Sequence, residues 1–162
     1  MGRAHKRFKI QKAKITQIIR IKSKCEAEAG NPIVRKVVNI SSISGTRGNA
    51  GQTNYSSAKA AVVGLSKTLA KEWGRYNVAV NSVAFGLIET RLTEATDSKK
   101  IIEIEGKEIP VGVPVQNVAA AKMMIPMGRP GTPAEAAGAV VGLCLPQSDY
   151  ISGQLIEVTG GL

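Results

Sequence analysis

The chain has few aromatic residues, two cysteines and no long apolar run. Aromatic residues make up 4% of the 162 residues, which disfavours nucleic-acid recognition by stacking of bases. Cys25 and Cys144 lie far apart without metal-site spacing, which suggests a reducing compartment, and we expect the Cys144 thiol to be buried in an apolar helix. No apolar run approaches the roughly 20 residues that span a bilayer. We therefore expect a soluble, cytoplasmic protein with no metal ligand set and no membrane partner.

The net charge of +10 is concentrated near the amino end. Residues 1–24 hold nine Lys or Arg and no acid, which leaves 13 basic and 12 acidic residues for the other 138. A basic tail of this kind fits a solvated or frayed helical segment, a mitochondrial-type targeting peptide, or an arm that binds nucleic-acid phosphates. We expect the first of these and do not expect a nucleic-acid partner.

The middle of the chain reads as strand, loop, helix and strand. Residues Arg35–Ile40 form an apolar, β-branched run, typical of a strand covered on both faces of a parallel sheet. A polar loop is expected over Ser41–Thr53 and a helix over Asn54–Trp73, which Gly74 ends. A second buried strand follows at Val78–Val83. The helix has an apolar spacing that predicts a core-facing side made of Ala58, Ala61, Val62, Leu65 and Leu69.

The last third adds a long loop, a helix and a strand. Residues 87–130 are expected to form a lid-like insertion with a small hairpin around Glu105–Gly106. Residues Thr132–Glu135 supply a helix cap, a first-turn proline and a capping acid, and the helix should run to about Leu145. A third strand is expected at Gly153–Thr159. This order predicts an α/β fold with a doubly wound parallel sheet.

Three side chains in the strand–loop–helix unit carry chemistry. Tyr55 and Lys59 are four residues apart, so on a helix they share one face. A phenol gives up its proton reluctantly, since its ordinary pKa is about 10, and an ammonium beside it favours the phenolate. The Ser42 hydroxyl, at the end of the preceding strand, is placed to hold a substrate carbonyl next to the phenol. Together they predict an acid–base site.

These residues stand in motifs that resemble the short-chain dehydrogenase/reductase family. About residues 35–162 resemble the carboxyl-terminal part of proteins in that family. Within the family, the resemblance is strongest to the 3-oxoacyl-acyl-carrier-protein reductase group. The motifs agree in order and spacing, which a lone Tyr-x-x-x-Lys would not achieve. They read NISSISG, GTRGNAGQTNYSSAKAAVVGLSKTLAKEWG, VNSVAFGLIET, IPMGRPGTPAEAAGAVVGLC and SDYISGQLIEVTGGL.

The resemblance implies a role for each matched residue. Tyr55 would pass a proton to or from the carbinol oxygen, Lys59 would assist it and bind the nicotinamide ribose, and Ser42 would hold the substrate carbonyl. Ile88 and Thr90 match positions that meet the nicotinamide amide and a neighbouring phosphate. Gly86 would allow close backbone approach. The cofactor would be NAD(P), bound by Tyr55, Lys59, Gly86, Ile88 and Thr90.

Other site classes are disfavoured by missing motifs. The glycines at 45, 48 and 51 belong to neither G-x-G-x-x-G nor the phosphate-loop pattern, so we interpret them as turn residues. Ser42 lacks the G-x-S-x-G elbow of a hydrolase nucleophile, and the only histidine, His5, lies in the basic tail.

The family's amino-terminal half, with its glycine-rich pyrophosphate turn, has no counterpart in these residues. We therefore expect a basic tail over 1–24 and, over 25–162, the carboxyl-terminal part of a Rossmann-type reductase domain that lacks the amino-terminal βαβ units. The predicted function is NAD(P)-dependent oxidation or reduction of a carbonyl or acyl substrate, with acyl-carrier protein and a second copy of the chain as expected partners. The alternatives are an inactive fragment serving as an interaction or oligomerisation module, and a basic-tail nucleic-acid binder.

Overall fold

The structure is a computed structural model that describes residues 33–90, 93, 95–96, 100–104, 107–111, 113–114, 119–120 and 123–162. The basic tail predicted over residues 1–24 lies outside these ranges. The described elements are β1 (Arg35–Ser42), α2 (Ile43–Arg47), α3 (Thr53–Trp73), η1 (Gly74–Tyr76), β2 (Val78–Phe85), β3 (Ala95–Thr96), β4 (Lys100–Ile104), β5 (Lys107–Val111), β6 (Val113–Pro114), α5 (Pro133–Cys144), η2 (Pro146–Ser148) and β7 (Leu155–Val158).

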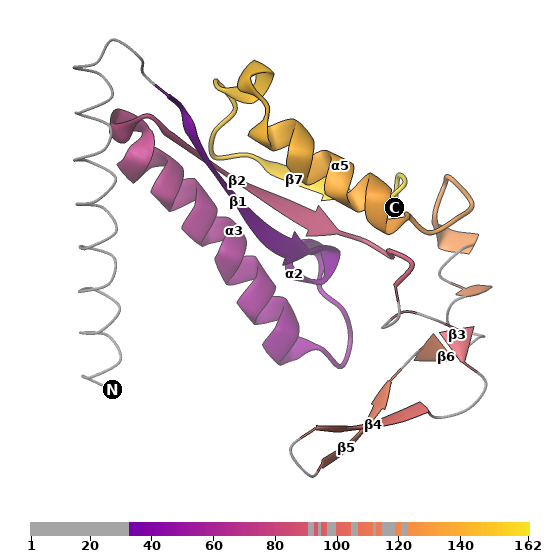
Figure 1. Cartoon of the computed structure of the whole chain (residues 1–162). Helices are drawn as coiled ribbons and strands as arrows, with labels where there is room; N and C mark the ends of the chain where they lie inside the picture. The colour runs from indigo at the N-terminus through magenta and orange to yellow at the C-terminus, as the bar shows by residue number, and fades with distance from the viewer. Residues whose placement is uncertain are drawn as a thin grey trace, which may run out of the picture.

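Three parallel strands form the centre of the fold, in the order β1-β2-β7 (Figure 1). β1 and β2 pair along their whole length, from Arg35 opposite Val78 to Ser42 opposite Phe85. All three strands end at the same edge, as parallel pairing requires. The predicted order of strand, helix, strand, insertion, helix and strand is confirmed, and with it the partial Rossmann-like α/β class.

The two long helices cover opposite faces of this sheet. On one face, the Asn39 amide donates to the Ser66 hydroxyl of α3 at 2.9 Å. On the other face, the Lys36 ammonium lies 2.8 Å from a carboxylate oxygen of Asp149, which follows η2, the short helix after α5. Adjacent strand residues point to opposite faces, so these two contacts define the sides. β2, between the other two strands, is consequently buried over all but its last residue.

β1 departs from the expectation of a strand covered on both faces. Its residues are mostly half-buried, and the Ile40 side chain is 43% exposed. Within the described residues, β1 has a strand neighbour only on the β2 side. A strand at the edge of a sheet keeps one row of backbone groups unpaired and has fewer side chains packed over it, which explains the exposure.

The core-facing side of α3 also differs from the prediction. The buried residues of this helix are Ser66, Leu69 and Trp73. Of the side predicted to face the core, only Leu69 is buried, and Leu65 is 41% exposed. Ser66 is buried at this position because its hydroxyl accepts from Asn39 and donates to the Val62 carbonyl at 2.8 Å. A satisfied polar pair in the interface therefore rotates the helix relative to its apolar spacing.

Of three further predictions, on the hairpin, the loop after β1 and the Cys144 thiol, only the first is fully confirmed. The hairpin is confirmed, because β4 and β5 pair antiparallel on either side of residues 105–106. The loop prediction over Ser41–Thr53 was wrong in part, since two of these residues extend β1 and the helix α2 follows. The buried-thiol prediction was wrong as well, because Cys144 is exposed. Leu143 is the buried residue there, and its neighbour turns about 100° away around the helix.

Among the helices that the structure describes, none is both long enough and apolar enough to cross a membrane.

Candidate active site

Tyr55 and Lys59 stand together near the start of α3, at the sheet edge where β1 and β2 end. The Lys59 Nζ lies 5.7 Å from the centroid of the Tyr55 ring. The tyrosine is 44% exposed, and within the described residues its hydroxyl makes no hydrogen bond. A solvent-facing phenol beside an ammonium can exchange a proton with a bound small molecule. The structure thus brings together two of the predicted site residues.

Lys59 is held at both its ends. Its ammonium donates to the Ile40 carbonyl at 3.2 Å, and its own carbonyl accepts from the buried Ser41 hydroxyl at 2.8 Å. The backbone of α2 also lies directly against it at Gly45. A Cβ atom on this glycine would lie 2.6 Å from the Lys59 carbonyl carbon and 2.7 Å from the Ala60 nitrogen. The position of Lys59 therefore depends on the end of β1 and on α2.

Ser41 and Gly45 contact Lys59, and the sequence analysis assigned neither of them to the site. The interpretation of Gly45 as a turn residue was wrong, because it lies within α2. Adjacent strand residues point to opposite faces, so alternation marks Ser41, rather than Ser42, as the serine that reaches α3. No comparable signal marks Gly45. The nearby glycines Gly48 and Gly51 have positive φ angles and make turns, whereas Gly45 is required by a contact with a helix that comes later in the chain.

Ser42 lies at the last position of β1 and is the N-cap of α2. Its hydroxyl oxygen accepts from the Ser44 N–H at 3.2 Å. A hydroxyl has one donor and two acceptor sites, so the Ser42 proton stays free to donate to a substrate oxygen. In the described part of the chain no hydrogen bond joins Ser42 to Tyr55 or Lys59. The three side chains share one edge of the sheet, but a bound molecule would be needed to connect them.

Gly86 follows β2 at this same edge, next to the pair formed by Phe85 and Ser42. Its N–H donates to the Val158 carbonyl at 3.0 Å. A Cβ atom here would lie 3.2 Å from the Thr159 Cα, tighter than most real contacts. The close backbone approach that requires this glycine is thus made by the end of β7. A role for Gly86 toward a cofactor stays a prediction.

Ile88 and Thr90 lie farther along the same connection. Ile88 forms an isolated parallel bridge with Gly131. The Thr90 N–H donates to the Thr93 hydroxyl at 2.8 Å, and that hydroxyl donates to the Ile88 carbonyl at 2.5 Å. The Thr90 N–H is therefore used inside a turn, and a contact of Thr90 with a phosphate stays a prediction. Thr93, which the sequence analysis did not single out, supplies the acceptor.

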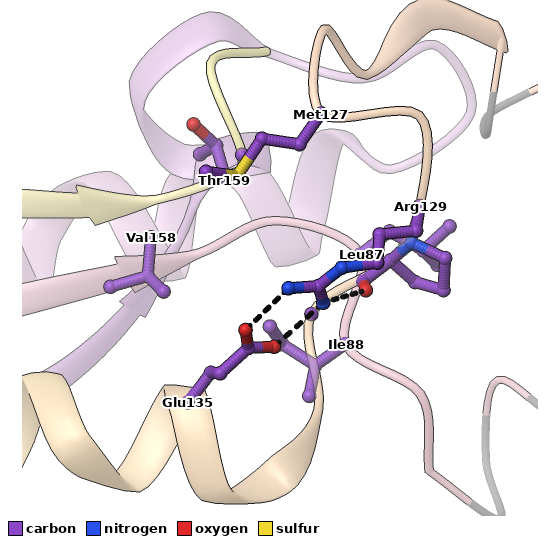
Figure 2. Close-up of a pocket in the computed structure, with 10 residues that line it drawn as sticks. Leu87, Ile88, Met127, Arg129, Glu135, Val158 and Thr159 are labelled. Atoms are coloured by element: carbon purple, nitrogen blue, oxygen red, sulfur yellow. Dashed lines mark hydrogen bonds and ion pairs between the residues drawn. The ribbon is translucent and has the colours of Figure 1, made fainter.

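A cavity of about 130 Å³ opens beside Ile88, at the carboxyl ends of β2 and β7 (Figure 2). The Arg129 guanidinium at its edge is neutralised by Glu135, to which it donates two hydrogen bonds, of 2.6 and 2.8 Å. Among the residues that line this cavity, the one cation is therefore paired with the one carboxylate, and the rest of the wall is mainly apolar. The lining residues are Leu87, Ile88, Met127, Arg129, Pro130, Gly131, Glu135, Val158, Thr159 and Gly160.

Glu135 also completes the predicted capping box of α5. Its carboxylate accepts from the Thr132 N–H at 2.8 Å, and the Thr132 hydroxyl accepts from the Glu135 N–H at 3.2 Å. The hydrogen bonds from Arg129, followed by those from Thr132, lower the pKa of Glu135 to about 2. The carboxylate is consequently ionised at neutral pH, and the start of α5 is tied to the cavity wall.

The described residues fit the nicotinamide end of a dinucleotide. The Lys59 ammonium has three donors and spends one on Ile40, which leaves donors for a ribose hydroxyl. The Tyr55 hydroxyl is unengaged and exposed beside it. Elsewhere in the described ranges, no three His, Cys, Asp or Glu side chains gather in a way that would hold a metal ion.

The parallel sheet with a tyrosine, a lysine and a serine at its carboxyl edge defines a short-chain dehydrogenase/reductase, and the chain belongs to that family. More particularly, residues 16–162 match the family model described as Enoyl-(Acyl carrier protein) reductase. This match covers most of the chain, including the whole predicted site.

Curated relatives agree with this assignment. The chain is 42% identical over 127 residues to the 3-oxoacyl-(acyl-carrier-protein) reductase FabG of Chlamydia muridarum, covering 78% of this chain and 44% of that protein. It is 39% identical over 137 residues to the human (3R)-3-hydroxyacyl-CoA dehydrogenase, covering 85% of this chain and 46% of that protein. The chain thus spans somewhat less than half the length of these relatives.

Proposed function

We propose that this chain supplies the proton-transfer half of an NAD(P)-dependent oxidoreductase site acting on a carbonyl or alcohol. The observation that carries the proposal is the Tyr55–Lys59 pair on α3, with the ammonium 5.7 Å from the ring centroid and the phenol unengaged. Ser42 lies at the end of the adjoining strand with its proton free. Family membership supports the same chemistry.

In the direction of reduction, each side chain has one task. The Ser42 hydroxyl donates to the substrate carbonyl oxygen and orients it. Tyr55 then gives its proton to that oxygen as negative charge develops on it. The Lys59 ammonium stabilises the phenolate that remains, and its spare donors hold a ribose hydroxyl. NAD(P)H, when bound, supplies the hydride. In oxidation the same residues act in reverse.

For the substrate we propose a 3-oxoacyl thioester or the matching 3-hydroxyacyl compound. The names of the relatives support this class, since they include reductases of 3-oxoacyl groups on acyl-carrier protein and dehydrogenases of 3-hydroxyacyl-CoA. We accordingly propose acyl-carrier protein as a partner and the cytoplasm as the location. The lid-like role of residues 87–130 belongs to this proposal, because part of that segment lines the cavity beside the predicted site.

A fluorescence titration with NADH and NADPH tests whether the chain holds a nicotinamide cofactor. We expect saturable binding by the wild-type chain and about tenfold weaker binding by Lys59→Met, because one or two charge-assisted hydrogen bonds are lost. Lys67→Met is the matched control, since it removes an equal charge two turns further along α3 and should bind as the wild type does. Absence of binding by the wild-type chain at millimolar cofactor would contradict the proposal.

The exposed side of α3 favours a second function, association between copies of the chain. Leu65 is 41% exposed in the middle of a 21-residue helix, and Ala61 and Ala58, one and two turns earlier on the same face, are exposed too. Apolar side chains grouped on one helix face are typical of an interface. We propose that two chains pack through this face, as the family resemblance also suggests.

Light scattering after size-exclusion chromatography tests this association. The wild-type chain should elute as a dimer or larger species, and Leu65→Lys should shift it toward the monomer because a buried charge in an apolar contact is costly. Val141→Lys places the same charge on an exposed apolar position of α5 and should leave the mass unchanged. A wild-type chain that is monomeric at all concentrations tested would rule the interface out.

A further inference from the structure

Glu157 on β7 makes a contact that the proposed chemistry does not use. Its carboxylate accepts from the Thr46 hydroxyl at 2.6 Å and forms an ion pair with the Arg47 guanidinium. Both donors belong to the last turn of α2, more than 100 residues earlier in the chain. These two donors hold the pKa of Glu157 below its ordinary value, so the group is a carboxylate at neutral pH.

The contact of Glu157 with α2 connects the two outer strands of the described sheet. Glu157 pairs with Ala84 of β2, which in turn pairs with Ser41 of β1. The α2 helix starts from the end of β1 and must therefore reach past β2 to touch β7, as its position at the strand ends suggests (Figure 1). The contact spans all three strands at their carboxyl edge.

The other attachments of α2 explain why a third one matters. Its first turn is capped by the Ser42 hydroxyl, and its Gly45 lies against the backbone of Lys59. The Ser44 hydroxyl also donates to the Gln52 side-chain oxygen at 3.1 Å. None of these attachments reaches Thr46 or Arg47, the last two residues of a helix only five residues long. Such a short helix is not stable by itself, and its last turn would open without a further contact. The Glu157 carboxylate supplies this contact by binding Thr46 and Arg47.

We infer that Glu157 is a positioning residue, which acts through Thr46 and Arg47 to hold α2, and with it the Ser42 hydroxyl and the loop leading to Tyr55, over the carboxyl edge of the sheet. The significance for catalysis rests on the proposed function, but the contact itself does not. Arg47 and Glu157 are 46% and 28% exposed, so this pair should add little to global stability. Its effect should be local to α2.

Amide hydrogen exchange measured by NMR on the full chain tests the inference. The reporter is the Gly48 N–H, which donates to the Ser44 carbonyl at 3.1 Å and closes the helix. In Arg47→Met and in Glu157→Met, this amide should exchange roughly fivefold faster, with little change in the urea midpoint. The double substitution should have no larger effect than Glu157→Met alone, because removal of this carboxylate already removes the contact with Arg47.

Lys36→Met is the matched control, because it breaks the ion pair with Asp149 on the other face of the sheet and should leave the Gly48 amide unchanged. A second readout is the ¹³Cζ resonance of Tyr55, which should shift in the Arg47 and Glu157 variants, with the Tyr150 resonance unmoved. The exchanged pair Arg47→Glu with Glu157→Arg should restore slow exchange at Gly48. Such a rescue shows that faster exchange in the single variants comes from the lost ion pair and not from poor folding.

The inference is overturned if Arg47→Met and Glu157→Met change the Gly48 exchange no more than Lys36→Met does, or if the exchanged pair fails to restore it. Its failure is distinguishable from that of the proposed function. Cofactor titration decides the latter, whereas the exchange and resonance measurements are made on the chain without cofactor.

Discussion

The Gly45→Ala variant should lose about 3 kcal/mol of the free energy of unfolding, at the upper end of the usual cost of overpacking. The added Cβ atom would lie 2.6 Å from the Lys59 carbonyl carbon and 2.7 Å from the Ala60 nitrogen. Both are backbone atoms in the middle of a helix, so neither can rotate away as a side-chain tip would. The strain can be relieved only if α2 and α3 separate.

That separation would also disturb the candidate site. Gly45 lies between Ser42 and Tyr55, and its contact is with the backbone of Lys59. Urea unfolding followed by circular dichroism measures the loss of stability. Amide exchange at Gly48 reports the displacement of α2. If Gly45→Ala unfolds at the same urea concentration as the wild type, the packing of α2 on α3 described above is wrong.

Gly64→Ala is the matched control for Gly45→Ala. Gly64 lies inside α3, and a Cβ atom built there would meet no other atom within 4 Å. Alanine is the better helix former by about 1 kcal/mol, so this variant should be more stable than the wild type. The same substitution is thus expected to have opposite signs at two glycines, because only one of them is needed for close packing.

The Tyr55→Phe variant should lose turnover by about 10² to 10⁴-fold in an assay that follows NAD(P)H oxidation with a 3-oxoacyl thioester. The substitution removes only the phenol oxygen and keeps the ring, whose centroid lies 5.7 Å from the Lys59 Nζ. Cofactor affinity should change much less than kcat, because Lys59 keeps its spare donors for the ribose while the proton donor is lost. An interaction lost only in the transition state has this signature.

Tyr150→Phe is the control for that experiment. Its ring is fully exposed after η2 and has no part in the predicted site, so kcat should match the wild type. If Tyr55→Phe retains full turnover, proton transfer by Tyr55 is excluded. If it loses cofactor binding to the same extent as turnover, Tyr55 serves binding rather than proton transfer.

Much of the fold was predictable from local patterns. The two β-branched runs that became β1 and β2, the capping residues Thr132 and Glu135, and the hairpin all appear where they were expected. Such features depend on residues a few positions apart, and their physical causes are backbone propensity and capping, which act within one element. The spacing of Tyr55 and Lys59 belongs to the same class.

The rest depended on contacts between segments that the sequence does not order. The apolar spacing of α3 predicted the wrong core side, because a buried hydrogen bond between Asn39 and Ser66 decides how the helix lies on the sheet. Cys144 was predicted to be buried and is exposed for a related reason, since Leu143 takes the core position.

The sequence by itself therefore determined the family and the proposed kind of chemistry, because Ser42, Tyr55 and Lys59 lie within 18 residues and their order is a local property. Only the tertiary structure decided what holds them. Ser41 and Gly45 meet Lys59, and Glu157 reaches α2, because parallel pairing brings the carboxyl ends of β1, β2 and β7 to one edge. The order of strands in a sheet is set by packing across the whole chain, and no local pattern encodes it.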